Sequence, residues 1–230
     1  MHILQCTGRV APVIVGGREA PEGKYPYQVS LRKYGQHSCG ASIINQRYIL
    51  TAAHLYPAEA TIHVGTNSLF DLGDVYDVER TIVHSGYIPG GGVDDIGLIR
   101  VTRNIEFNEK VQPIPLATTN FGKAGEVAVL TGWGTLEEDG EAPERLQEID
   151  LPIEPQRSCK WFHARVSNAQ ICTLTKVGEG ACHGDSGGPL VLNGVQIGLV
   201  SYSSGCAAGV PDVFTRVYHF QDWIKKNMMP

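Results

Sequence analysis

Residues 180–190 read GACHGDSGGPL, and they place a serine hydroxyl, a carboxylate and four glycines in one short segment. A serine hydroxyl is a poor nucleophile at its free pKa, so it needs a base within hydrogen-bond reach. Glycine has no Cβ, which leaves Gly184 free to turn its N–H toward a ligand beside the N–H of Ser186. The segment therefore predicts a nucleophile loop, although an ordinary turn of small residues explains the same letters.

The rest of the chain contains the partners that a serine nucleophile requires. A base and an orienting carboxylate come from distant parts of the sequence and meet in the fold. His54 ends the segment TAAH (residues 51–54), and Asp95 stands directly before the apolar run IGLI (residues 96–99). The neighbouring Asp94 is expected to be a solvated loop acid. The candidate triad is thus His54, Asp95 and Ser186, in that order along the chain.

This order of motifs resembles the chymotrypsin family of serine proteases. Further motifs of the resemblance are IVGG at residues 14–17 and TGWG at residues 131–134, and the likeness runs from Ile14 to the C-terminus. The letters GEGACH before the serine look most like those of insect chymotrypsins. The resemblance implies a serine endopeptidase in which the N–H groups of Gly184 and Ser186 hold the oxyanion.

The fold is expected to be all-β. From Tyr27 onward, short runs of β-forming residues alternate with turn residues. Together with the resemblance, this predicts two antiparallel six-stranded β-barrels, over residues 14–115 with His54 and Asp95 and over residues 116–230 with Ser186 and the specificity pocket. A C-terminal helix is expected within residues 218–229, where apolar residues recur at spacings of three and four.

Residues 1–13 are expected to be a propeptide or a partial N-terminal segment. Their apolar part is too short for the core of a signal peptide, so a missing signal segment is an open alternative. In the family, a cut before the equivalent of Ile14 frees an amino group that pairs with the equivalent of Asp185. Val13 stands where an arginine or lysine would mark that cut, so the sequence does not predict how the bond between Val13 and Ile14 is cleaved. His37 matches a histidine that holds this acid in some zymogens, and a surface histidine is the alternative.

Six cysteines suggest an oxidising compartment, and secretion is expected. The resemblance implies two disulfides, which join Cys159 to Cys172 and Cys182 to Cys206. Two thiols are expected to stay free. Leu55 occupies the position of the usual partner of Cys39, and Pro115 occupies that of the partner of Cys6.

The resemblance also assigns a specificity pocket, with Gly180 at the floor and Ala181, Ser201, Tyr202 and Ser203 in the walls. Trypsins carry an aspartate at the floor position, so Gly180 predicts a preference for aromatic or leucine side chains before the scissile bond. Ser201 also resembles the serine that supports the triad aspartate. Asp212 replaces a glycine near the pocket base, where it either accepts a basic side chain or is satisfied internally.

Composition and charge exclude several other classes. A net charge of −5, a pI near 5.9 and the absence of a basic block argue against nucleic acid or an anionic membrane as a partner. No apolar run approaches the roughly 20 residues of a spanning helix. The acids at residues 71–79 suggest a calcium loop, but Thr66 follows Gly65 where the family's loop begins with an acid. No metal and no cofactor are expected.

The expected function is a secreted serine endopeptidase with chymotrypsin-like preference and a digestive role. Its expected partners are protein or peptide substrates and protein protease inhibitors, and the chain is expected to be a monomer. The alternative is a non-catalytic homologue or a locked zymogen that acts as a binding protein, motivated by Val13 and the unpartnered Cys39. The intact His54, Asp95 and Ser186 argue against that alternative.

Overall fold

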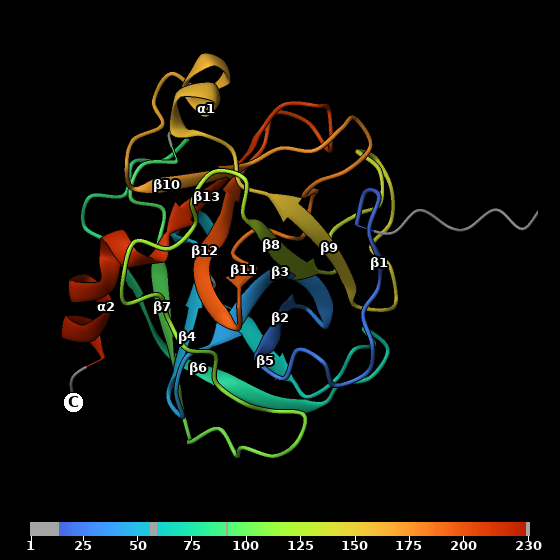
Figure 1. Cartoon of the computed structure of the whole chain (residues 1–230). Coiled ribbons are helices and arrows are strands. Elements are labelled where there is room, and N and C mark those ends of the chain that lie inside the picture. Colours follow the sequence, from blue (N-terminus) through green and yellow to red (C-terminus); the bar gives the residue numbers. More distant parts are fainter. Residues whose placement is uncertain (1–13, 56–58, 91, 229–230) are drawn as a thin grey trace, which may run out of the picture.

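The computed structural model describes residues 14–55, 59–90 and 92–228 of the chain as two bodies of antiparallel strands (Figure 1). The first body is a closed barrel with the strand order β2-β3-β4-β7-β6-β5. Its strands are β2 (Gln28–Lys33), β3 (Gln36–Ile43), β4 (Tyr48–Thr51), β5 (Ala60–Val64), β6 (Asp74–Val83) and β7 (Gly97–Val101). Alternate residues such as Val29 and Leu31 on β2 point into one core, which closure of the barrel shields from water.

The second body is a seven-stranded sheet with the order β1-β9-β8-β11-β12-β13-β10. Its strands are β1 (Arg18–Glu19), β8 (Val127–Gly132), β9 (Gln147–Pro152), β10 (Gln170–Thr173), β11 (Pro189–Leu192), β12 (Val195–Tyr202) and β13 (Asp212–Arg216). The ends of β9 and β10 meet through an isolated bridge between Ile153 and Thr173. The backbone N–H of Glu154 donates to Cys172 O at 2.8 Å beside this bridge.

The prediction of an all-β fold is confirmed, and the second body departs from it in one detail. Its sheet is open. It has seven strands because β1, near the start of the described chain, pairs with β9. Ile14 is fully buried in the core of this body, with Ala181 and Leu190 among its neighbours. Residues 14–19 thus pack on the second body, and the division of the chain at residues 115 and 116 stays a prediction.

The predicted C-terminal helix is confirmed as α2 (Gln221–Asn227), which follows a short 3₁₀ turn, η2 (Val217–Phe220). Phe220 and Ile224 pack against Leu50 and Leu98 of the first barrel. A second helix, α1 (Gln156–Phe162), was not predicted from the sequence. In α1 only Cys159 is buried, so the segment has no apolar period to read. Neither described helix is long and apolar enough to span a membrane.

Buried polar pairs join the two bodies. Ser42 on β3 donates its hydroxyl to the side-chain oxygen of Gln196 on β12 at 2.6 Å, and both residues are fully buried. Thr131 on β8 donates in the same way to Gln28 on β2, also at 2.6 Å. Because buried polar groups need partners, these bonds fix how one body is placed on the other.

Candidate active site

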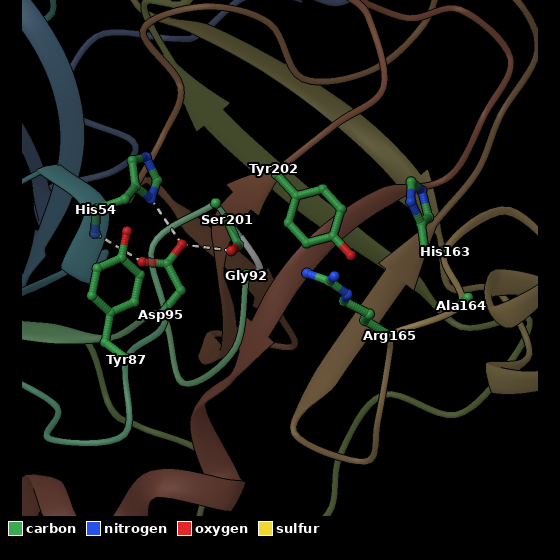
Figure 2. Close-up of a pocket in the computed structure, with 10 residues that line it drawn as sticks. His54, Tyr87, Gly92, Asp95, His163, Ala164, Arg165, Ser201 and Tyr202 are labelled. Atoms are coloured by element: carbon green, nitrogen blue, oxygen red, sulfur yellow. Dashed lines mark hydrogen bonds and ion pairs between the residues drawn. The ribbon is translucent and has the colours of Figure 1, made fainter.

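His54 and Asp95 meet where β4 and β7 lie side by side. The two strands are antiparallel, with Thr51 opposite Gly97, so the residue after one and the residue before the other share an edge. His54 lies in the 3₁₀ turn η1 (Ala53–Leu55), and its Nδ1 is 2.8 Å from Asp95 Oδ2 (Figure 2). The backbone N–H of His54 donates to Asp95 Oδ1 at 2.9 Å. The carboxylate therefore holds both the ring and the backbone of His54.

The second body completes the shell around Asp95. Ser201 donates its hydroxyl to Asp95 Oδ2 at 2.6 Å, and Thr215 donates to the backbone oxygen of Asp95 at 2.7 Å. The side chain of Asp95 is 2% exposed, whereas that of His54 is 29% exposed. A carboxylate at Nδ1 stabilises the tautomer in which Nε2 is a free proton acceptor. Nε2 of His54 is thus the nitrogen available as a base, while Nδ1 is held by Asp95.

Asp94 differs from the sequence expectation of a solvated acid. Its side chain is 27% exposed, and its Oδ2 lies 3.5 Å from Nδ1 of His84. Its backbone has φ +48°, a left-handed conformation that aspartate tolerates better than most residues. This conformation directs Asp94 to His84 and leaves Asp95 to His54.

The serine loop lies against the His54 turn. Gly40 on β3 donates its N–H to Ser186 O at 2.9 Å, and Gly187 donates to Val200 O at 2.8 Å. A Cβ on Gly187 would lie 2.2 Å from Thr51 Oγ1, so only glycine permits this close approach. No hydrogen bond joins Ser186 Oγ to His54 in the described residues. Such catalytic contacts are often long in the free enzyme and tighten with substrate.

Two backbone N–H groups of the serine loop, those of Gly184 and Ser186, are without an acceptor within the described part of the chain. His37 Nε2 lies 3.1 Å from Gly184 O, and its Nδ1 lies 2.9 Å from Ser30 Oγ. Burial lowers the pKa of His37 to about 4, so the neutral ring donates Nε2–H to Gly184 O and accepts from Ser30. His37 thereby fixes the carbonyl group of Gly184, a role that the sequence did not indicate. It makes no hydrogen bond to Asp185 in the described residues, unlike the zymogen histidine that it matches.

Asp185 is a fully buried carboxylate with backbone donors. Gly134 N–H donates to Oδ1 at 2.8 Å and Cys182 N–H donates to Oδ2 at 3.0 Å. Burial raises its pKa to about 6, and the two backbone bonds oppose the rise. A Cβ on Gly132 or Gly134 would lie 2.2 or 2.1 Å from a carboxylate oxygen, which explains the glycines of the TGWG motif.

The segment that follows Ile14 is hydrogen-bonded to the start of the serine loop. Gly180 donates its N–H to Val15 O at 3.1 Å, which fixes the IVGG segment against the serine loop. No basic side chain pairs with Asp185 among the described residues. The partner expected from the resemblance is the amino group that a cut before Ile14 would free. Val13 and Cys6 lie outside the described residues, so the structure does not bear on their predicted roles.

Two disulfides brace the second body. One joins Cys159 of α1 to Cys172 of β10, and the other joins Cys182 to Cys206 beside the serine loop. These are the pairs that the resemblance implied. Cys39 is free and half-buried, and burial raises the pKa of its thiol. A buried, protonated thiol behaves as a small apolar side chain.

Asp212 lies directly beneath Gly180 at the expected floor of the specificity pocket. Its Oδ2 accepts the Ala181 N–H at 2.8 Å, and a Cβ on Gly180 would lie 2.6 Å from that oxygen. Its Oδ1 has no hydrogen-bond partner among the described residues, and the residue is 6% exposed. Burial raises the pKa of Asp212 to about 7, and the nearby Asp185 adds to the rise. One carboxylate oxygen of Asp212 is therefore hydrogen-bonded within the protein, and the acid titrates near neutral pH.

A cleft of about 580 Å³ runs from His54 and Asp95 past Ser201 and Tyr202. Gly180, Ala181, Ser203 and Asp212 do not line this cleft. It is also lined by residues that the sequence analysis missed, namely Tyr87, Gly90, Gly92, His163, Ala164 and Arg165. They belong to separate loops with no motif in common, so no local signal pointed to them.

No group of three histidine, cysteine or acidic side chains with a metal-binding arrangement occurs in the described residues. The loop that suggested calcium contains an internal cation instead. The guanidinium of the buried Arg32 donates to Leu69 O at 3.0 Å and to Asp71 O at 2.9 Å. Glu79, one of the acids that suggested calcium, pairs with Arg47 and Arg100.

The trypsin family model matches residues 14–224, which include the whole arrangement above. The chain belongs to the trypsin family of serine proteases. Chymotrypsin-2 of Vespa crabro is 52% identical over 220 residues, covering 94% of this chain and 100% of that protein. Trypsin II-P29 of Gallus gallus is 37% identical, covering 98% and 96%.

A solved structure of mouse neuropsin, a serine protease expressed in the limbic system, has the same fold. Its TM-score is 0.88 at 30% identity, and the match covers 93% of this chain and 99% of that one. Membership of this family makes the chain a serine endopeptidase whose substrates are proteins.

Proposed function

We propose that this endopeptidase uses Ser186 as nucleophile, His54 as base and Asp95 as the group that orients His54. The observation that carries the proposal is the fixed His54–Asp95–Ser201 chain of hydrogen bonds, which leaves His54 Nε2 free to accept a proton. Ser186 Oγ attacks the peptide carbonyl while His54 Nε2 accepts its proton and then gives it to the leaving amine. Water reverses the sequence on the acyl-enzyme ester and regenerates Ser186.

The two unpaired amides of the serine loop suit the developing oxyanion. The N–H groups of Gly184 and Ser186 donate to no other described residue, so they cost no rearrangement when the carbonyl oxygen becomes negative. His37 contributes by holding the Gly184 peptide in place. Removal of a donor of this kind typically lowers the rate about 10²- to 10³-fold.

For specificity, we infer a chymotrypsin-like preference for aromatic or leucine side chains before the scissile bond. Gly180 offers no acid at the pocket floor, and the similarity to a hornet chymotrypsin supports the same reading. Asp212 favours a second specificity, because its Oδ1 has no partner among the residues that the structure describes and is available to a basic side chain. Cleavage after arginine or lysine is therefore the competing proposal.

The further proposals concern where the enzyme works. Two disulfides suit an oxidising compartment, so we propose secretion. A digestive role follows from the resemblance to insect chymotrypsins. Protein protease inhibitors are proposed as ligands of the same cleft, and a monomer is proposed for the free enzyme.

A locked zymogen or non-catalytic binding protein is the second candidate function. Val13 before Ile14 favours it, since trypsin-like activators do not cut after valine. The buried Asp185, with no charged partner among the described residues, fits an uncut chain. Against it stands the complete set of His54, Asp95 and Ser186 on the fold of an active family.

The test compares kcat/KM for matched peptides that differ only in Phe, Leu or Arg before the scissile bond. We expect the order Phe and Leu above Arg at pH 6, with no hydrolysis by the Ser186→Ala variant. An enzyme that prefers Arg at this pH would contradict the proposed specificity. Absence of all hydrolysis in a chain that begins at Ile14 would favour the binding-protein alternative.

A further inference from the structure

The substrate cleft continues beyond His54 to a basic wall. His54 and Asp95 lie at one end of the cleft of about 580 Å³, and Arg165 lies across it, beyond Tyr202 (Figure 2). Tyr202 directly follows Ser201 on β12, and we expect the substrate to lie along this strand. A peptide spans about 3.3 Å per residue when extended, so residues two to four positions before the scissile bond reach this wall.

The floor of this part of the cleft is fixed from both sides. A Cβ on Gly92 would lie 2.2 Å from Tyr202 Cε1, so the loop backbone packs directly on the ring, and φ +60° at Gly92 suits glycine. The ring of His163 packs edge-on against Tyr202 with centroids 5.3 Å apart. Tyr202 therefore has little freedom to move and forms a rigid platform.

Two bonds hold the loops that bear these contacts. Gln170 on β10 donates its side-chain N–H to Gly92 O at 3.0 Å. His163 Nε2 lies 2.8 Å from Pro211 O, to which it donates. The walls on either side of Tyr202 are thus tied to the second body, and the cleft is formed before substrate arrives.

Arg165 places a positive charge on this platform. Its guanidinium points toward the Tyr202 hydroxyl (Figure 2). Burial raises the pKa of Tyr202, and the charge of Arg165 acts against that rise, which reflects their proximity. The side chain is exposed at the cleft wall, where an arriving peptide can reach it.

The charge of Arg165 has no Asp or Glu partner in the part of the chain that the structure describes. Arg165 forms no ion pair within residues 14–55, 59–90 and 92–228, and the remaining residues contain no Asp or Glu. The segment from residue 155 to 175 contains three cations, Arg157, Lys160 and Arg165, and no acid. A protein with a net charge of −5 thus has a locally basic segment, and Arg165 is the cation of this segment that lines the cleft.

We propose that Arg165 is a specificity-determining residue that selects substrates with an Asp or Glu side chain two to four residues before the scissile bond. The proposal rests on the proposed acyl-enzyme function of the same cleft. Arginine stays charged and presents several N–H donors, which suits a carboxylate. Because Arg165 is exposed, the expected gain is about two- to five-fold in kcat/KM and falls with salt.

The experiment uses fluorogenic peptides with Phe before the scissile bond and Glu, Gln or Lys at the second, third or fourth position before it. We expect the Glu/Gln ratio of kcat/KM to exceed about two at one of these positions at low salt. The ratio should fall to about one in Arg165→Gln, invert in Arg165→Glu and approach one at 0.5 M salt.

Matched controls separate this proposal from the protease function itself. Arg157→Gln removes an exposed arginine of α1 that does not line the cleft, and it should keep the wild-type ratio. A short substrate, in which Phe precedes the scissile bond and no further residue precedes Phe, should be cleaved equally by wild type and Arg165→Gln. A Glu/Gln ratio near one at all three positions in wild type, or a ratio unchanged in Arg165→Gln, would overturn the proposal. If the wild-type enzyme does not cleave the short substrate at all, that result would instead count against the proposed function.

Discussion

Asp212 is a buried acid next to Gly180, near the expected base of the specificity pocket. It lies under Gly180 with one oxygen bonded to Ala181 N–H and one without a partner. Burial raises its pKa to about 7, so the carboxyl is mostly neutral at pH 6 and mostly charged at pH 8.5. The same pocket therefore changes from a polar, neutral floor to an anionic one over the working range of many proteases.

The ratio of kcat/KM for an Arg substrate to that for a Phe substrate should rise as pH increases through 7. A charged acceptor adds about 1 kcal/mol over a neutral one, which corresponds to about five-fold. Taking the ratio cancels the pH dependence of groups that serve both substrates. In Asp212→Asn the ratio should not change between pH 6 and 8.5. A pH-independent ratio in wild type would show that Asp212 does not reach the substrate.

At the scale of elements, the junction between β3 and η1 is where this chain departs from its family. Cys39 on β3 and Leu55 in η1 both pack against the core of the first barrel. His54 lies next to Leu55, so the turn that holds the proposed base is attached by packing and by Asp95 and lacks the usual covalent bridge.

Replacing Leu55 by cysteine should restore that bridge. A new disulfide between residues 39 and 55 is expected to raise the free energy of unfolding by about 3 kcal/mol, because it closes a loop of about 15 residues in the unfolded chain. Urea unfolding with and without reductant measures the gain. The Leu55→Cys, Cys39→Ser double variant is the matched control and should gain nothing. If both thiols of Leu55→Cys still react with alkylating reagent, the two elements are not placed as described.

The two bodies of the whole molecule depend on each other at the active site. His54 and Asp95 come from the first barrel, whereas Ser186, Ser201 and Thr215 come from the second. The buried pair of Ser42 and Gln196 fixes their relative placement. We therefore expect the described fold to unfold as one unit.

Ser42→Ala should lower the free energy of unfolding by about 1 to 3 kcal/mol, because it leaves the buried side-chain oxygen of Gln196 without a donor. Thermal unfolding should keep one transition and shift it to lower temperature. Ser204→Ala, at an exposed position, is the control and should change little. Two separate transitions in either protein would contradict the coupling of the two bodies.

The sequence predicted the parts of this molecule that depend on local pattern or on motifs. The strands from Tyr27 onward and α2 follow from apolar periodicity. The α1 helix was not predicted, because it buries only Cys159. The β1 strand was not predicted either, because it is two residues long and pairs with β9, which is distant in the sequence. A pairing between residues so far apart in the sequence produces no pattern in a short stretch of residues.

The same limit applied to the candidate site. His54, Asp95 and Ser186 each lie in a motif, so the sequence pointed to them directly. The cleft walls at Gly92 and Arg165 are single residues on separate loops, and their common position around Tyr202 arises only from the fold. The role of His37 at Gly184 O needed the same knowledge of which loops meet.

The most direct test of the account is the mass of the protein after reaction with a fluorophosphonate, which labels activated serines. A Val13→Arg variant allows immobilised trypsin to release a chain that begins at Ile14. We predict one label per released chain, absent from the Ser186→Ala variant and strongly reduced in His54→Ala. A released, folded chain that takes no label, or a label that persists in Ser186→Ala, would contradict the assignment of Ser186 as the nucleophile.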